Sequence, residues 1–175
     1  MVVNVHHFAN KIVDYLKTND FGVDIQVSDE TEQLLDTGGG IKRAALLFDA
    51  TLPVLIHNVD ILSNVDLASF YKRALEQKID ALLLVSCRVT QRYLIFDHHM
   101  RLVGWTNVAT GEVKSPHDNI LHMRFIPPTE DVTSYYQQGY YLYAFSGIHI
   151  LAPSAIKGVE AVKEEKFPIM DFYLR

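Results

Sequence analysis

The sequence contains a single cysteine and no long apolar run. Cys87 stands alone among 175 residues, so the chain cannot form an internal disulfide. It lies in the apolar stretch "DALLLVSCR", which predicts a buried, unreactive thiol and a reducing compartment. No stretch approaches the roughly 20 apolar residues of a membrane-spanning helix, and the first residues lack a signal-peptide pattern. These absences predict a cytoplasmic protein without a membrane partner.

Positive charge and linker sequences are scarce as well. The 16 Lys and Arg residues are outnumbered by 21 Asp and Glu residues, and the net charge of -5 argues against nucleic-acid binding. No repeat, low-complexity segment or linker rich in Pro, Gly and Ser marks an internal boundary. We therefore expect one domain over residues 1–175, in which any anionic ligand takes its counter-charge from a local site or a metal.

Apolar periodicity predicts alternating strands and helices in the first half of the chain. Strands are expected in "VVNV", "GVDIQVS", "PVLIHN" and "DALLLVSC", with helices over 7–18, 41–48 and 66–78. This β-α-β-α-β-α-β order predicts a mostly parallel, Rossmann-like sheet in a three-layer α/β fold. After residue 90, "RYLIFD" and "LVGWTN" predict a hairpin, "NILHMRFI" and "YYLYAFSGIHIL" two strands, and "FPIMDFYLR" a terminal helix. We therefore expect an appended hairpin and mixed β region.

The segment "DTGGGIKR" at 36–43 holds three consecutive glycines ahead of a predicted helix. It matches neither the phosphate-binding pattern G-x-x-x-x-G-K-[ST] nor G-x-G-x-x-G. Backbone N–H groups at a helix start can bind an anion or a base. A simple glycine-rich connection explains the run equally well, and composition leaves both interpretations open.

A second candidate site follows the strand "PVLIHN". Asn58 and Asp60 stand two residues apart where the strand ends, and ligands of open α/β sheets bind beyond the carboxyl ends of strands. A carboxylate there suits Mg²⁺, which prefers oxygen ligands and bridges to phosphates. Alternatively, Asp60 caps the short turn before the next helix, for which Asn64 and Asp66 are the N-cap candidates.

Four segments together resemble the sugar-1-phosphate nucleotidyltransferases, also called NDP-sugar pyrophosphorylases. They are "VVNVHHFANKIVDYL" (2–16), "LLDTGGGIKRA" (34–44), "PVLIHNVDILSNVDL" (53–67) and "FSGIHILAP" (145–153). They occur in family order and are most similar to small bacterial members that make GDP- or UDP-activated sugars. The resemblance implies guanylyl or uridylyl transfer from an NTP to a sugar-1-phosphate with Mg²⁺, which releases an NDP-sugar and pyrophosphate.

The resemblance also assigns roles to individual residues. The implied nucleotide contacts come from the glycine segment, namely Thr37, Gly38, Gly39 and Gly40. Asp60 corresponds to the catalytic aspartate that holds Mg²⁺. The implied sugar contacts are Asn58, Asn107 and Gly147.

Two family motifs do not occur in this sequence. One is the G-x-G-T-R phosphate loop with its P-K lysine, and the other is a second metal-binding aspartate in a D-x-G context near the end. The comparison implies a domain cut at both ends that is weakly active or inactive by itself. The alternatives are a non-catalytic nucleotide-sugar-binding or assembly module, or an enzyme with another phosphorylated acceptor. An unpaired strand edge would also favour pairing with a second copy, as a homo-oligomer.

Overall fold

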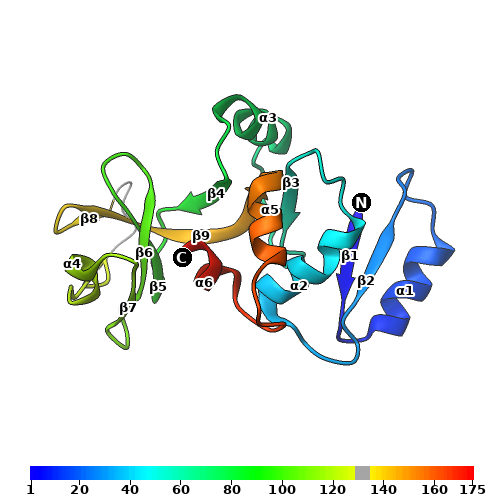
Figure 1. Ribbon diagram of the computed structural model, residues 1–175, viewed down its shortest axis with the longest axis horizontal. Helices are drawn as coiled ribbons and strands as arrows, with labels where there is room; N and C mark the ends of the chain where they lie inside the picture. The colour runs from blue at the N-terminus through cyan, green and yellow to red at the C-terminus, as the bar shows by residue number, and fades with distance from the viewer. Residues whose placement is uncertain (129–134) are drawn as a thin grey trace. The chain divides into compact units, whose positions relative to one another are not determined.

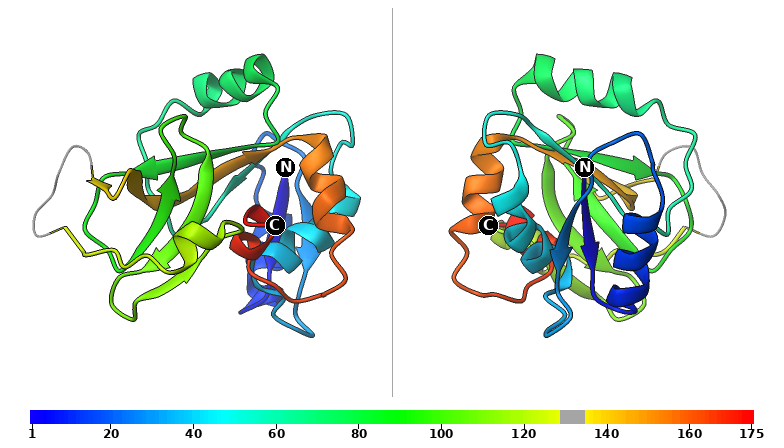
Figure 2. Two further views of the ribbon diagram at one scale, coloured as in Figure 1. Left: turned by 60° about the vertical axis from the view of Figure 1, so that its left-hand side comes forward. Right: turned by 90° about the vertical axis from the view of Figure 1, so that its right-hand side faces the viewer.

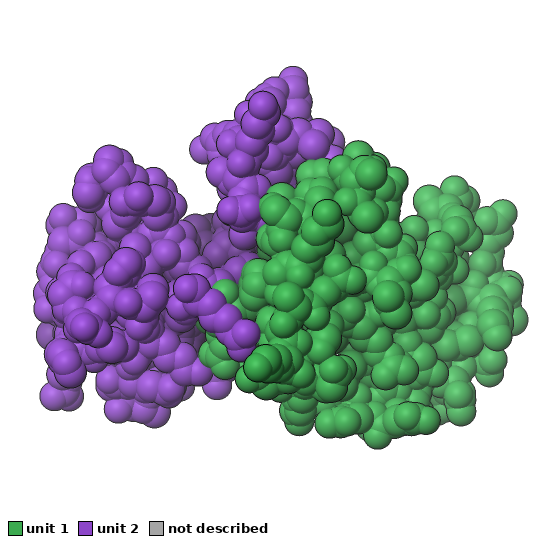
Figure 3. Space-filling model, in the orientation of Figure 1, with its two compact units in different colours: residues 1–54, 151–172 green, residues 55–150, 173–175 purple. Residues whose placement is uncertain are grey.

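The computed structural model describes residues 1–128 and 135–175, which form two compact units (Figure 3). Unit 1 comprises residues 1–54 and 151–172, and unit 2 comprises residues 55–150 and 173–175. The single domain expected over the whole chain stays a prediction.

Unit 1 contains a two-stranded parallel sheet (Figure 1). Strand β1 (Val2–Val5) pairs in parallel with β2 (Gln26–Asp29). Helix α1 (Ala9–Thr18) connects the two strands. A parallel pair needs such a crossover, because a tight turn can join only antiparallel strands. The predicted β-α-β order is confirmed here.

The remaining helices of unit 1 come from both ends of the chain. They are α2 (Asp36–Ala44), the short 3₁₀ helix η1 (Ala45–Leu47), α5 (Pro153–Glu160) and most of α6 (Ile169–Tyr173). Helix α2 packs against α5. Ile41 and Ala44 are the buried apolar side chains of α2, and Ile156 and Val159 are buried in α5. Apolar residues at these i, i+3 spacings form the contacting helix faces.

Unit 2 is built on a seven-stranded sheet (Figures 1 and 2). Its strands are β3 (Val54–His57), β4 (Ala81–Ser86), β5 (Arg92–Phe96), β6 (Leu102–Asn107), β7 (Glu112–Lys114), β8 (Tyr136–Gln137) and β9 (Tyr140–Leu151). The order is β3-β9-β5-β6-β7, and β4 and β8 also pair with β9. Helices α3 (Leu67–Gln77) and α4 (Asp118–Leu121) complete the unit. The long strand β9 thus holds four other strands together.

A buried apolar cluster of unit 2 includes residues of β5, β6 and β9. Ile95 of β5 stands opposite Leu142 of β9, and both are fully buried. The other members of the cluster are Tyr93, Val103, Ile120 and Phe125. Burial of this apolar surface stabilises the strands that carry the candidate residues described below.

The prediction of a mostly parallel sheet is only partly correct. The fold is α/β, but β5 pairs antiparallel with β6 and β9, β6 with β7, and β8 with β9. Short connections explain the β5–β6, β6–β7 and β8–β9 pairs, since a hairpin can join only antiparallel strands. In the β8–β9 turn, Gln138 and Gly139 have φ values of 52° and 93°. Two successive positive φ values are typical of a type I′ hairpin turn.

The strand predicted in "NILHMRFI" was wrong. Residues 118–121 form α4, and residues 123–128 have no regular structure. Ile120 and Phe125 are nevertheless buried beneath the sheet. The apolar pattern correctly indicated burial but not the backbone conformation.

Candidate functional site

The glycine segment belongs to a helix and is not a loop. Gly38, Gly39 and Gly40 lie within the first half of α2 and are buried, whereas Thr37 is exposed. The N–H groups of Gly38 and Gly39 both donate to the carbonyl oxygen of Phe167, at 2.8 and 3.2 Å. The N–H groups in the first turn of a helix have no partner within that helix. Here the chain satisfies two of them with its own backbone.

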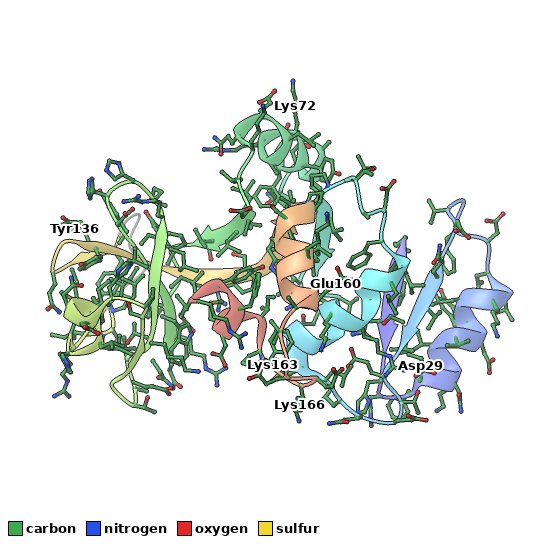
Figure 4. The ribbon with its side chains drawn as sticks, viewed as in Figure 1. Asp29, Lys72, Tyr136, Glu160, Lys163 and Lys166 are labelled. Atoms are coloured by element: carbon green, nitrogen blue, oxygen red, sulfur yellow. The ribbon has the colours of Figure 1, made fainter. Side chains whose placement is uncertain are left out.

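Close packing explains why glycine occupies all three positions. A Cβ at Gly38 would overlap the Phe167 ring, and one at Gly39 would overlap the backbone oxygen of Glu165. A Cβ at Gly40 would lie 2.7 Å from Oε1 of Glu30. The segment 163–168 after α5, on which Lys163 and Lys166 are labelled in Figure 4, therefore approaches α2 at backbone distance.

Glu30, which the sequence interpretation missed, is a buried carboxylate beside the glycine helix. Only 2% of it is exposed. Its Oε1 accepts a hydrogen bond from Asn4 Nδ2 at 2.7 Å, and its Oε2 accepts one from the N–H of Leu35 at 3.1 Å. It thereby links β1 to the residue that precedes α2. In the sequence, the only indication of this role is that an acidic residue directly follows a predicted strand with β-branched residues.

Thr37 and Lys42 also contact the segment after α5. The Thr37 hydroxyl oxygen accepts a hydrogen bond from the N–H of Ile169 at 2.9 Å. Lys42 Nζ donates to the carbonyl oxygen of Val162 at 3.0 Å and forms a 2.7 Å ion pair with Glu165. The ammonium group of Lys42 is thus engaged within unit 1.

In unit 2, two of the predicted sugar-contacting residues lie together. The N–H of Asn58, just after β3, donates to the carbonyl oxygen of Gly147 in β9 at 3.0 Å. Gly147 has a φ of 72°, and a Cβ there would lie 3.0 Å from Asn58 Nδ2. Glycine therefore permits both this backbone conformation and the approach of the Asn58 side chain.

Asp60 lies on the exposed turn that follows β3. The turn is closed by the N–H of Ile61, which donates to the carbonyl oxygen of Asn58 at 3.1 Å. Within the described part of the chain, no hydrogen bond or ion pair engages the Asp60 carboxylate. Of the two N-cap candidates for α3, Asp66 is confirmed, and it accepts a hydrogen bond from the N–H of Ser69 at 3.0 Å.

Asp60 is a single exposed carboxylate on its turn. No group of three or more His, Cys, Asp or Glu side chains suited to a metal occurs among residues 1–128 and 135–175. Mg²⁺ does not need such a cage, since it is often held by one or two carboxylates together with water and substrate phosphates. An exposed carboxylate that the fold does not use meets that requirement.

Asn107, the third predicted sugar-contacting residue, lies at the end of β6. Its side-chain oxygen accepts a hydrogen bond from the N–H of Ala109 at 3.1 Å, and its carbonyl oxygen accepts one from the N–H of Gly111 at 2.8 Å. This arrangement closes the turn between β6 and β7. The structure does not bring Asn107 into contact with Asn58 or Gly147.

His149 and Tyr173 form a buried pair in unit 2. His149 is 3% exposed, and the Tyr173 hydroxyl donates to its Nδ1 when that nitrogen carries no proton. Burial lowers the pKa of His149 to about 4 and raises the pKa of Tyr173 above its ordinary value. The His149 ring contacts the rings of Phe145 and Tyr173.

Comparison with known proteins identifies related sequences and folds. No family model matches the chain. Over 62 residues, or 34% of the chain, the sequence is 42% identical to the N-acetylmuramate alpha-1-phosphate uridylyltransferase of Caulobacter vibrioides. The resemblance to the sugar-1-phosphate nucleotidyltransferases is confirmed. The match spans 25% of that relative.

Solved structures share the fold of the chain. HddC from Yersinia pseudotuberculosis matches 97% of this chain with a TM-score of 0.65 and 19% sequence identity, and the chain spans 61% of HddC. A structure of HddC complexed with GMP-PN gives a TM-score of 0.63 and 20% identity. These structures confirm the α/β fold that the resemblance to the nucleotidyltransferases implies. In the described residues, no helix is both long and apolar enough to span a bilayer.

Proposed function

We propose that the chain carries nucleotide-, metal- and sugar-binding residues of an enzyme that transfers NMP from an NTP to a sugar-1-phosphate. One observation carries most weight. Asp60 is exposed directly after β3, the fold leaves its carboxylate unused, and the neighbouring Asn58 is hydrogen-bonded to Gly147. The uridylyltransferase of Caulobacter vibrioides supports the reaction class.

In this reaction a phosphate oxygen of the sugar-1-phosphate attacks the α-phosphorus of the NTP. The new P–O bond forms as the bond from the α-phosphorus to the bridging oxygen breaks, and pyrophosphate leaves with that oxygen. The protein contributes mainly alignment and charge neutralisation. Asp60 would hold Mg²⁺, which when bound neutralises charge on the phosphates.

The remaining assigned residues have binding roles in this proposal. Thr37 and the glycines at 38–40 contact the nucleotide, and Asn58, Asn107 and Gly147 contact the sugar. The N–H groups of Gly38 and Gly39 already donate to Phe167. Phe167, Glu165 and Glu30 occupy the space beside the glycines, so we assign the nucleotide contact of α2 mainly to its exposed start at Thr37.

Nucleotide binding is the first test, since it does not depend on turnover. A thermal-shift screen measures the melting temperature with UTP, GTP, ATP or CTP, each with Mg²⁺, and with several NDP-sugars. Nucleotides of one base should raise the melting temperature more than the others. A uridine nucleotide corresponds to the Caulobacter relative and a guanine nucleotide to the HddC complex, so both are included. Binding without pyrophosphate release would favour the nucleotide-sugar-binding module instead.

Pyrophosphate release with Mg²⁺ and a panel of sugar-1-phosphates tests catalysis. Asp60→Ala should lower kcat/KM on the order of 100-fold or more, because even partners outside the metal coordination sphere contribute about 10- to 100-fold. Asp66→Asn serves as the matched control, since it removes a nearby carboxylate charge and retains the helix cap. Measurable turnover of equal size in wild type and Asp60→Ala would exclude the metal assignment.

A further inference from the structure

The ends of two strands meet the middle of β9 in unit 2. After β3, the N–H of Asn58 donates to the carbonyl oxygen of Gly147 at 3.0 Å. After β4, the Arg88 guanidinium donates to the carbonyl oxygen of Phe145 at 3.3 Å. Residues 145 and 147 are two positions apart on one strand, so Arg88 and the turn carrying Asp60 extend from neighbouring points of β9.

The backbone around Arg88 is fixed by a buried side chain. Tyr93 is 2% exposed, and its hydroxyl donates to the carbonyl oxygen of Arg88 at 3.3 Å and accepts from the N–H of Thr90 at 2.9 Å. Ser86, the last residue of β4, also lies 3.5 Å from Ser146 through their hydroxyl oxygens. A flexible side chain thus starts from a rigid base, which lowers the entropy lost when it binds a ligand.

Two other cations, Lys42 and Arg101, are paired within the fold. Lys42 forms an ion pair with Glu165, and Arg101 forms one with Asp97. Arg88 is exposed, and in the part of the chain that the structure describes its guanidinium takes part in no ion pair. Its contact with Phe145 uses one of five N–H donors.

We propose that Arg88 is a phosphate-binding residue of the site that contains Asn58, Asp60 and Gly147. This inference rests on the proposed function. A planar guanidinium binds two phosphate oxygens at once, which lysine cannot do. The chain has a net charge of -5. An arginine whose backbone is held beside the strand ends would therefore supply positive charge where the phosphates of either substrate bind.

Binding of simple probes tests the proposal on the whole chain. Isothermal titration calorimetry would measure Kd for inorganic pyrophosphate, glucose-1-phosphate, and uridine or guanosine without phosphate. Arg88→Gln should weaken binding of at least one phosphate probe about 10-fold or more and leave nucleoside binding within about 2-fold. Arg88→Lys should recover only part of the loss. Arg124→Gln is the control, because it removes an exposed arginine of unit 2 with the same change of net charge.

The outcomes separate this proposal from the proposed function. Weakened pyrophosphate binding assigns Arg88 to the phosphates of the NTP, and weakened glucose-1-phosphate binding assigns it to the acceptor. If wild type binds nucleoside and phosphate probes but Arg88→Gln binds them equally well, the Arg88 proposal is wrong and the proposed function stands. If wild type binds none of the probes, both are wrong. If Arg88→Gln and Arg88→Lys have melting temperatures near that of wild type, their weaker phosphate binding does not come from unfolding.

Discussion

At the scale of single residues, the three glycines of α2 illustrate how one sequence feature serves packing. Glycine weakens a helix by up to about 1 kcal/mol per residue relative to alanine, so three in succession require a compensating gain. The gain is close approach: Phe167, the backbone of Glu165 and the carboxylate of Glu30 occupy the space where side chains would lie. The glycine pattern left open a ligand site or a simple connection, and nothing local could identify residues 165–167 as the packing partner.

Gly39→Ala should therefore destabilise the protein despite the higher helix propensity of alanine. The new Cβ would overlap the backbone oxygen of Glu165, and overpacking of this kind typically lowers stability by about 1–3 kcal/mol. The free energy of unfolding is obtained from urea denaturation. Gly158→Ala in α5 is the matched control, since its Cβ would lie 3.1 Å from the movable ring of Phe172. A Gly39→Ala variant as stable as wild type would contradict the close approach of residues 163–168 to α2.

At the scale of secondary-structure elements, the first turn of α3 is stabilised by its N-cap residue, Asp66. Asp66 Oδ1 accepts a hydrogen bond from the N–H of Ser69 at 3.0 Å, and Asp66 Oδ2 accepts one from the Ser69 hydroxyl at 2.6 Å. The hydrogen bonds from Ser69, its hydroxyl first, lower the pKa of Asp66. The capping carboxylate is thus kept ionised at neutral pH.

Asp66→Ala should lower stability by about 0.5–2 kcal/mol through loss of this cap. Asp60→Ala should change stability by less than about 0.5 kcal/mol, because its carboxylate is exposed and not used by the fold. Amide hydrogen exchange in the first turn of α3, together with urea denaturation, measures both effects. A loss of stability in Asp60→Ala as large as in Asp66→Ala would show that the Asp60 carboxylate has a structural role, which would weaken the metal assignment.

The sequence predicted individual elements better than their arrangement. Alternating apolar residues located β9 over its full length, and the β5–β6 hairpin was also predicted correctly. Pairing sense and strand order depend on contacts between distant segments, which local periodicity does not encode. For the same reason, the roles expected of Asn58 and Gly147 came from the resemblance to a family, and their mutual contact was not predicted. Arg88 gave no local signal.

At the scale of the whole molecule, burial of one titratable side chain affects stability as a function of pH. The pKa of His149 is lowered to about 4 by desolvation, whereas the unfolded chain has the ordinary value of 6.5. Above pH 6.5 His149 is neutral in both the folded and the unfolded protein. The full stability of the folded protein is then present. Between pH 6.5 and 4 the unfolded state binds more protons, so stability is lost as the pH falls through this range.

The difference between the two pKa values corresponds to roughly 3 kcal/mol, of which about 2 to 3 kcal/mol should be lost by pH 4.5. The test compares urea denaturation of wild type and His149→Gln at pH 7.5 and pH 4.5. His149→Gln should be less stable at pH 7.5, since it disturbs the contact with Tyr173, but its deficit should shrink by about 2 kcal/mol at pH 4.5. His98→Gln, which removes an exposed imidazole at the β5–β6 turn, is the control. A deficit of equal size at both pH values would show that His149 becomes protonated in the folded protein, and that the buried pair with Tyr173 opens in acid.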